Sequence, residues 1–581
     1  MRKMTVKETA EPVNKEMNHL QLLIQRMAGL ESRYDPGICM LRSPFSSPGY
    51  HTTLKQAEFI HSTRDSLSYA LGLLDTELAR YEQRAFDIIR QVISLQDTDR
   101  SHATFGIWSW FYEEPLHQMA PPDWNWADFC GSRLVQAIAR HGHRFPEGLR
   151  EDMIHSIDYA CEAIIRRNVG PDYTNIAIIG AFVTRIAGEQ LGREDYAAYG
   201  LERLRKLHAH TMEHGAFQEY NSPVYTYIAI LELSKLQSET TDSTVKALTG
   251  ELLELTWKTV AGYYHPATAQ WSGPHSRSYG ALLNEQSKAF LQMATGGAVK
   301  FFPWKELPYE EEWYRSGIHC PPAYLAGFTS PETKEVRQLL EGEGEGQMDG
   351  GKWAVTYMTP QFSIGSFTHS DLWNQRRPLV VYADNHGQPA YIRLRCLHDG
   401  YDYCSARFKS LQEAEHLLFG VDFITDGGDT HPNLDRTGGI IEAADLRLRL
   451  EIGGCLDGII AGPTEEGASI IIGGTAFNLT TWFAAFSGHA GAVRSWAWEI
   501  HNAEDSINID MILYTGPRRS IDFISLQQAA LVFSLEVQPE HEEAVYAEPL
   551  LEMTDDGGLR VNRSSGRDGG FLLQLNPGPA K

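Results

Sequence analysis

Hydrogen-bonding side chains crowd the stretch GAFQEYNSPVYTYIAILEL, residues 215 to 233, just before and inside the first turn of an apolar segment. A helix start needs one capping side chain, and a proline suits its first turn. This stretch supplies six polar or aromatic side chains within ten positions: Gln218, Glu219, Tyr220, Asn221, Tyr225 and Tyr227. The surplus makes the loop a candidate for substrate binding or proton transfer. The alternative is that these residues form only caps and turns.

Three further loops of the same kind precede apolar segments: PPDWNWADF, GPDYTNIAIIGAF and SGPHSRSYGALL. The four loops recur at intervals of about 50 residues, which predicts one helical hairpin per repeat, with an inner and an outer helix. Stacked hairpins form either an open solenoid or a closed α/α toroid. In a toroid the loops before the inner helices converge on one cavity. The side chains that we expect to face it include Asn175, Tyr225, His275 and Arg277.

The chain of 581 residues has two halves with different hydrophobic patterns. From about residue 66 to 300 apolar residues recur at helical spacing, and from about 350 onward short β-rich runs such as RPLVVYA and LRLRLEI are broken by glycine and asparagine. PETKEVRQLLEGEGEGQMDGG lies between them and is polar and glycine-rich. We therefore predict an α+β multidomain protein with a helical toroid domain at 1–330, a linker at 331–351 and an antiparallel β-sandwich-like domain at 352–581.

Two of these stretches resemble the heparinase II/III-type and related alginate-lyase-type polysaccharide lyases. DYTNIAIIGAF is similar to an inner helix of that family that begins with an asparagine, here Asn175. GAFQEYNSPVYTY resembles the next inner helix, whose pattern is Gly, aromatic, Glu, then Ser-Pro-x-Tyr, and this places Tyr225 at the catalytic tyrosine. The family has histidine after that tyrosine, whereas this chain has Thr226. The resemblance implies the same toroid followed by a β-sheet domain.

The chemistry that the resemblance implies is β-elimination at a 4-linked uronic acid. A base removes the proton at C5, an acid protonates the leaving oxygen at C4, and the sugar carboxylate must be neutralised because it opposes a developing carbanion. Asn175 would neutralise the carboxylate, helped by Arg277 or His275, and Tyr225 would transfer protons once nearby cations lower its pKa. The side chains expected to bind substrate are Asn221, Glu219, Arg277, Tyr279, Tyr227, Trp124 and Trp126.

The β half adds GSFTHSDLWNQRRPLVVYADNHG. His369 lies where related lyases bring a histidine from the sheet domain to the toroid. It is therefore a candidate catalytic residue, and the alternative is a histidine at the surface or at a strand end. Arg376 and Arg377 either pair with acids or hold a substrate carboxylate. No cofactor is required by this chemistry. A structural zinc or calcium in the β domain is a second option, although the histidines and aspartates lack a diagnostic metal spacing.

The composition of the chain limits which kinds of binding partner are expected. A net charge of −24 argues against nucleic acid or an anionic membrane as the main partner. Seven scattered cysteines without a CxxC pair and a start without a signal peptide predict a cytoplasmic protein. A uronic-acid-containing oligosaccharide, attacked near its end, is the expected substrate, and homo-oligomerisation stays open.

Two other classes of function compete with the lyase. A glycoside hydrolase on the same plan would pair Glu219 with Asp123, Asp172 or Glu285. A non-catalytic carbohydrate-binding scaffold would instead offer aromatic platforms, drawn from Trp108, Trp110, Trp124 and Trp126. The loops favour the lyase, because Asn, Tyr, His and Arg dominate them and a single acid falls inside the central motif.

Overall fold

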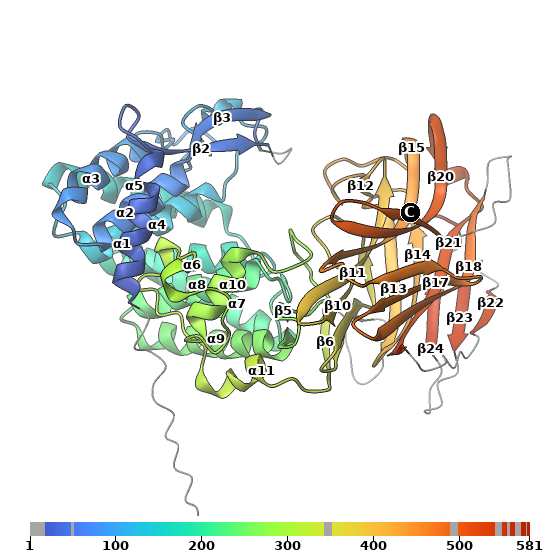
Figure 1. Ribbon diagram of the computed structural model, residues 1–581. Helices are drawn as coiled ribbons and strands as arrows, with labels where there is room; N and C mark the ends of the chain where they lie inside the picture. Colours follow the sequence, from blue (N-terminus) through green and yellow to red (C-terminus); the bar gives the residue numbers. More distant parts are fainter. Residues whose placement is uncertain are drawn as a thin grey trace, which may run out of the picture. The chain divides into compact units, whose positions relative to one another are not determined.

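The computed structural model describes residues 18–47, 51–341, 351–487, 498–540, 549–554, 558–563, 571–576 and 578–580. The chain divides into two compact units (Figure 1). The helical unit comprises Met1–Glu213, Tyr225–Trp257 and Glu285–Pro322. The β unit comprises His214–Val224, Lys258–Asn284 and Ala323–Lys581. The predicted order of a helical region followed by a largely antiparallel β region is confirmed.

Helical hairpins build the helical unit. Helices α2, α4, α6 and α8 pack side by side in that order, and each is followed in the chain by a helix of the outer row. Helices α4 and α6 are buried on nearly all sides, whereas α5 and α7 bury one stripe each, as inner and outer helices require. The helices are α1 (His19–Leu30), α2 (Thr63–Asp75), α3 (Ala79–Ile93), α4 (Trp126–His141), α5 (Glu147–Arg167), α6 (Thr174–Leu191), α7 (Glu194–His214), α8 (Tyr225–Glu239), α9 (Ser243–Tyr263), α10 (Glu285–Ala294) and, in the β unit, α11 (Ala326–Thr329). A small sheet of β1 (Tyr34–Asp35), β2 (Met40–Ser46) and β3 (Gln56–His61) lies near the start of the chain.

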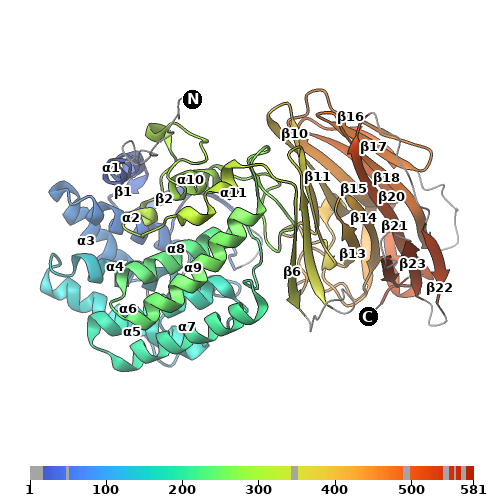
Figure 2. The same cartoon turned by 90° about the horizontal axis from the view of Figure 1, so that it is seen from below.

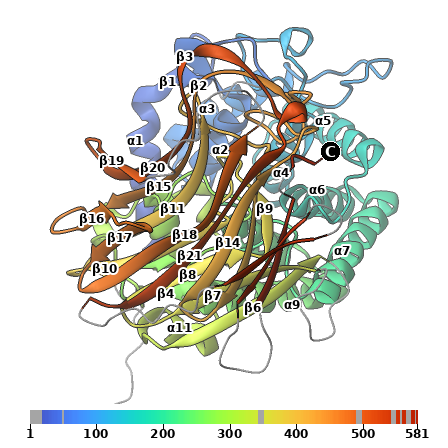
Figure 3. The same cartoon turned by 90° about the vertical axis from the view of Figure 1, so that its right-hand side faces the viewer.

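Two antiparallel sheets pack face to face in the β unit (Figures 2 and 3). In the described residues the larger sheet has nine strands: β19 (Trp498–Asn502), β20 (Ser506–Asp522), β15 (Ile440–Gly454), β11 (Gln388–His398), β10 (Leu379–Asn385), β8 (Phe362–Phe367), β7 (Lys352–Met358) and β6 (Lys334–Glu341), with β12 (Tyr401–Asp402) attached to β11. The second sheet runs β16 (Ile460–Pro463), β17 (Gly467–Ile472), β18 (Thr475–Ser487), β21 (Gln528–Pro539), β14 (His416–Phe423), β13 (Ala406–Glu413) and β9 (His369–Asp371).

Alternation along the strands creates the core of this sandwich. Ile392 and Leu394 of β11 and Leu448 and Leu450 of β15 point inward with apolar residues of β14 and β21, and the residues between them point outward. A third sheet of β22 (Leu550–Met553), β23 (Leu559–Arg563) and β24 (Phe571–Leu575) packs its apolar residues on Leu418 of β14 and Val532 of β21. The hairpin β4 (Tyr264–His265) and β5 (Gln270–Trp271) completes the unit.

The structure divides the chain differently from the predicted domain boundaries. The expected linker contains β6, which pairs with β7 at the edge of the nine-stranded sheet, while residues 342–350 lie outside the described residues. His214–Val224 and Lys258–Asn284, expected in the helical domain, belong to the β unit. The polar, alternating sequence of β6 suits an exposed edge strand, which composition alone does not separate from a linker.

Candidate functional site

Two loops of the β unit are joined through Asn221. Its side-chain amide donates to the carbonyl oxygens of Ser272 (2.8 Å) and Pro274 (2.9 Å), and its oxygen accepts from the Trp271 indole (2.6 Å). The backbone of Asn221 is left-handed, with φ of 47°, which asparagine tolerates better than most residues. Asn221 is 2% exposed. We predicted that it binds substrate, but its amide instead positions the loop that carries His275 and Arg277.

Close backbone contact fixes the same loop on the sheet. A Cβ atom at Gly365 of β8 would lie 1.9 Å from the Gly273 oxygen, and one at Gly273 would lie 2.1 Å from a methyl of Val380 in β10. The Gly273 oxygen also accepts from the Thr356 hydroxyl of β7 at 2.6 Å. Residues 272–275 therefore lie directly on the outer face of the nine-stranded sheet.

His275 lies under this loop and is completely buried. Its Nδ1 is 2.7 Å from the Asn221 carbonyl oxygen, which can only accept, so Nδ1 carries the proton. Its Nε2 faces the Tyr382 hydroxyl at 3.5 Å, and that hydroxyl donates to the Ala281 oxygen. Burial lowers the pKa of His275 to about 4. A neutral, enclosed imidazole suits a positioning role, and this burial argues against the predicted proton transfer.

Arg277 emerges from the buried part of the loop. Its Nε donates to the Gln375 side chain (3.1 Å), and its Nη1 lies 3.7 Å from a Glu219 oxygen. The guanidinium stands 5.0 Å from the centre of the Trp373 ring, at cation–π distance. A quarter of the Arg277 side chain remains accessible. The result is a cation of fixed direction that solvent can reach.

Two further polar side chains, Arg376 and His431, contact the Trp373 ring beside Arg277. Arg376 lies 5.8 Å from this ring and pairs with Asp371 at 2.6 Å, while His431 meets the ring edge-on at 5.1 Å. Burial lowers the pKa of His431. We call Glu219, Arg277, Trp373, Arg376 and His431 the arginine–tryptophan cluster. The sequence pointed to Glu219, Arg277 and Arg376, but it did not single out Trp373, and His431 carried no local signal.

Asn175 and Tyr225 belong to the helical unit, where they open neighbouring inner helices. Asn175 is the second residue of α6 and is 4% exposed, and its side-chain oxygen accepts from the Ile176 N–H at 2.9 Å. Tyr225 is the first residue of α8 and is half-buried. Tyr227 packs on Phe290 with ring centres 5.2 Å apart, and burial raises its pKa. Tyr227 is therefore mainly a packing residue.

The tryptophans predicted to contact sugar differ in exposure. Trp108 is fully buried, and Trp126 is 7% exposed, stacks on Trp110 and donates to the Thr63 hydroxyl. Trp124 is 37% exposed, with its indole bonded to the Ala103 oxygen. Trp126 is thus a core residue of its repeat instead of the predicted platform, and Trp124 still offers a ring to solvent.

The remaining candidates lie apart from these groups. His369 is exposed at the start of the edge strand β9, where partial desolvation of the ring and the nearby Lys352 lower its pKa, and its catalytic role stays a prediction. Tyr279 is 56% exposed. Both Asp123 oxygens accept hydrogen bonds, from the Trp110 indole and the Asn125 N–H, so this acid orders the turn before α4.

No group of three or more His, Cys, Asp or Glu side chains placed to hold a metal ion occurs in the part of the chain that the structure describes. Two acidic or histidine side chains of the β unit already have other partners, because Asp402 pairs with Arg395 and His398 with Asp429. All seven cysteines are free. Among the described helices none is both long and apolar enough to cross a bilayer.

Residues 21–299 match the model of a family described as a domain of unknown function, DUF8769. No curated protein matches the chain in sequence. Among solved structures the chain is similar to heparinase III, at 12% identity and a TM-score of 0.49, over 99% of this chain and 94% of that one. It is also similar to the Streptomyces coelicolor A3 chondroitin AC lyase, solved with chondroitin sulphate, at 11% identity and a TM-score of 0.45, over 96% of this chain and 85% of that one. At these identities the similarity concerns the fold alone.

Proposed function

We propose that this protein is a carbon–oxygen lyase that cleaves a uronic-acid-containing oligosaccharide by β-elimination. The observation that carries the proposal is Arg277, a partly accessible guanidinium whose direction is set by Glu219, Gln375 and Trp373. A planar guanidinium matches a carboxylate geometrically, and the buried Trp373 ring beside it holds the guanidinium in place. In this proposal Arg277 binds an acidic group of the substrate.

Tyr225 and Asn175 have the roles that the sequence resemblance implies. Asn175 stabilises the charge that develops at the carboxylate, and Tyr225 transfers the proton at C5 or C4. The first turn of a helix suits both roles, because its backbone N–H groups and the positive end of the helix dipole favour nearby negative charge. His275 acts through the loop that it supports.

The hydrolase alternative requires two carboxylates that act as acid and base. Glu219 is engaged by Arg277, and both oxygens of Asp123 are used in the turn before α4. These contacts favour the lyase. Asp172 and Glu285 are exposed and keep the hydrolase as the second candidate.

The decisive experiment incubates the protein with a panel of uronides and measures two products in parallel. A lyase produces an unsaturated uronate, seen by ultraviolet absorbance, in step with new reducing ends. New reducing ends without that absorbance would identify a hydrolase, and neither signal across the panel would favour a binding scaffold. A mock preparation from cells that do not express the protein is the control for contaminating activity.

Product size tests the finer proposal that the enzyme acts at chain ends. We expect mono- or disaccharides from the first minutes, with little loss of average polymer length. A ladder of mid-length products with a rapid fall in polymer size would contradict end action while leaving the lyase chemistry intact.

A further inference from the structure

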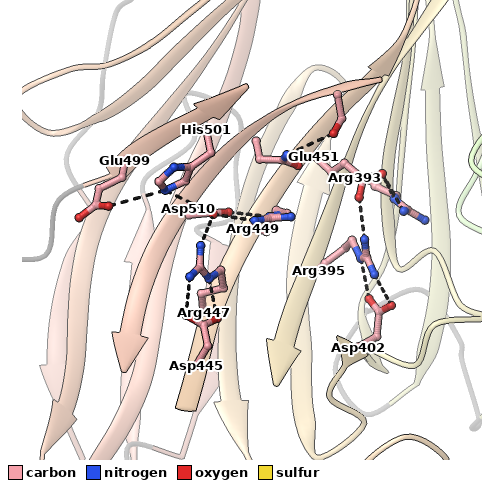
Figure 4. A network of polar contacts seen from close by, with 12 residues as sticks. Arg393, Arg395, Asp402, Asp445, Arg447, Arg449, Glu451, Glu499, His501 and Asp510 are labelled. Carbon is pink, nitrogen blue, oxygen red and sulfur yellow. Dashed lines mark hydrogen bonds and ion pairs between the residues drawn. The ribbon is translucent and has the colours of Figure 1, made fainter. Parts of the chain in front are cut away.

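The outward face of the nine-stranded sheet carries a ladder of arginines and acids (Figure 4). Asp510 of β20 forms ion pairs with Arg447 and Arg449 of β15, each with a nitrogen–oxygen distance of 2.7 Å. Glu451 of β15 forms ion pairs with two arginines of β11, Arg393 at 2.6 Å and Arg395 at 2.7 Å. Arg395 also reaches Asp402 of β12, at 2.6 Å. Each of these four arginines thus has at least one carboxylate partner.

Arg377, just before β10, does not follow this pattern. The residue is 4% exposed, and no carboxylate lies within ion-pair distance of it among the residues that the structure describes. Its Nη1 donates to the carbonyl oxygens of Asn374 (2.6 Å) and Arg376 (2.8 Å). Its Nε is buried and has no hydrogen-bond partner. Nη2 is not among the buried unpartnered atoms, so it is the nitrogen that solvent reaches.

The charged surroundings of Arg377 increase the need for a counter-ion. Burial and the nearby Arg393 lower the pKa of Arg377 to about 10, and this fall persists although Asp402, which lies beyond ion-pair distance, acts in the opposite direction. A buried cation without a partner costs free energy that a bound anion would recover. The bonds from Nη1 hold the guanidinium so that Nε and Nη2 form its remaining edge. Because solvent does not reach Nε, Nη2 is the group of this edge that meets an anion, through a charge-assisted hydrogen bond.

We propose that Arg377 is the centre of an oxyanion site that binds a carboxylate or sulfate group of an acidic saccharide. The backbones of Arg377 and His275 exchange two hydrogen bonds, at 3.0 and 3.1 Å, so the site adjoins the loop that carries Arg277. Assigning the anion to a saccharide rests on the proposed function. The anion site itself rests on the unpaired Arg377.

Thermal unfolding of the full-length protein in sodium sulfate, sodium glucuronate and sodium chloride at equal ionic strength tests this proposal. Three proteins are compared: wild type, Arg377→Gln, and Arg519→Gln, a matched change at an exposed arginine of β20. Sulfate stabilises proteins in general, so the quantity of interest is the difference between variants in the same salt. We expect wild type and Arg519→Gln to bind sulfate or glucuronate roughly 10- to 100-fold more tightly than Arg377→Gln. Equal shifts in all three proteins would overturn the proposal.

Calorimetric titration of the wild type can refute the site even if Arg377→Gln does not fold. We expect heat with sulfate or glucuronate, weakened by added sodium chloride, and none with glucose. Binding of glucuronate without sulfate identifies the carboxylate as the ligand group, and the reverse identifies sulfate. Absence of binding by both anions refutes the site. Because no turnover is measured, failure of the lyase assay leaves this result unaffected.

Discussion

The hydroxyl of Tyr225 is the group on which the proposed chemistry depends most directly. Tyr225→Phe removes it while keeping the half-buried ring, so folding should survive and turnover should fall by roughly 10²- to 10⁴-fold. Tyr227→Phe is the matched control, because Tyr227 packs on Phe290 and should matter little for kcat. Steady-state kinetics on a uronide that the wild type cleaves measure both. Near wild-type turnover in Tyr225→Phe would remove Tyr225 from the mechanism.

His275 makes the stability of the protein depend on pH. Its pKa is about 4 when folded against 6.5 as a model value, so between these values the unfolded chain binds a proton that the folded chain does not. The free energy of unfolding therefore has its full value above pH 6.5. It decreases as the pH falls towards 4, by up to about 3 kcal/mol. His275→Asn keeps an N–H donor and should flatten this loss, seen by denaturant unfolding at pH 7 and 4.5. His386→Asn, at an exposed histidine, should keep the wild-type slope.

At the scale of elements, the contact between β8 and the loop at 272–275 determines where Arg277 lies. Gly365→Ala would place a methyl group 1.9 Å from the Gly273 oxygen, so the loop must move. Overpacking of this kind costs about 1–3 kcal/mol, and we expect a lower melting temperature together with weaker substrate binding. Gly462→Ala, in β16 with open space around it, is the matched control and should change neither. An unchanged kcat/KM in Gly365→Ala would show that the loop position is unimportant.

At the scale of the whole molecule, the β unit requires chain segments from the helical half of the sequence. A fragment of residues 331–581, cut at the boundary that the sequence suggests, lacks His214–Val224 and Lys258–Asn284. Gly365, Val380 and Tyr382 would then lose the loop that covers them. We expect this fragment to bind a hydrophobic dye and to be cut by proteases at concentrations that leave the β unit of the full chain intact. A cooperative, protease-resistant fragment would contradict this.

The sequence by itself determined the succession of elements and the types of residue available for chemistry. Polar loops near Asp123, Asp172, Asn221 and His275 predicted that an apolar helix follows each, and period-two runs predicted the antiparallel sheets. In the structure the helices that follow begin at Trp126, Thr174, Tyr225 and Glu285. These features are local, because one helical turn or one strand suffices to encode them. For the same reason the sequence marked Asn221 and His275 as polar loop residues without showing that both are buried supports.

Tertiary structure alone decided which residues meet. Trp373 and Gln375 lie about a hundred positions from Arg277 in the chain, and no local pattern links them. The assignment of β6 to the nine-stranded sheet depends on its pairing with β7, because a polar edge strand and a linker have the same composition. The lack of a carboxylate at ion-pair distance from Arg377, among the residues that the structure describes, is likewise visible only in three dimensions. Charge pairing depends on which strands lie side by side, and that is set by the packing of the two sheets over their common core.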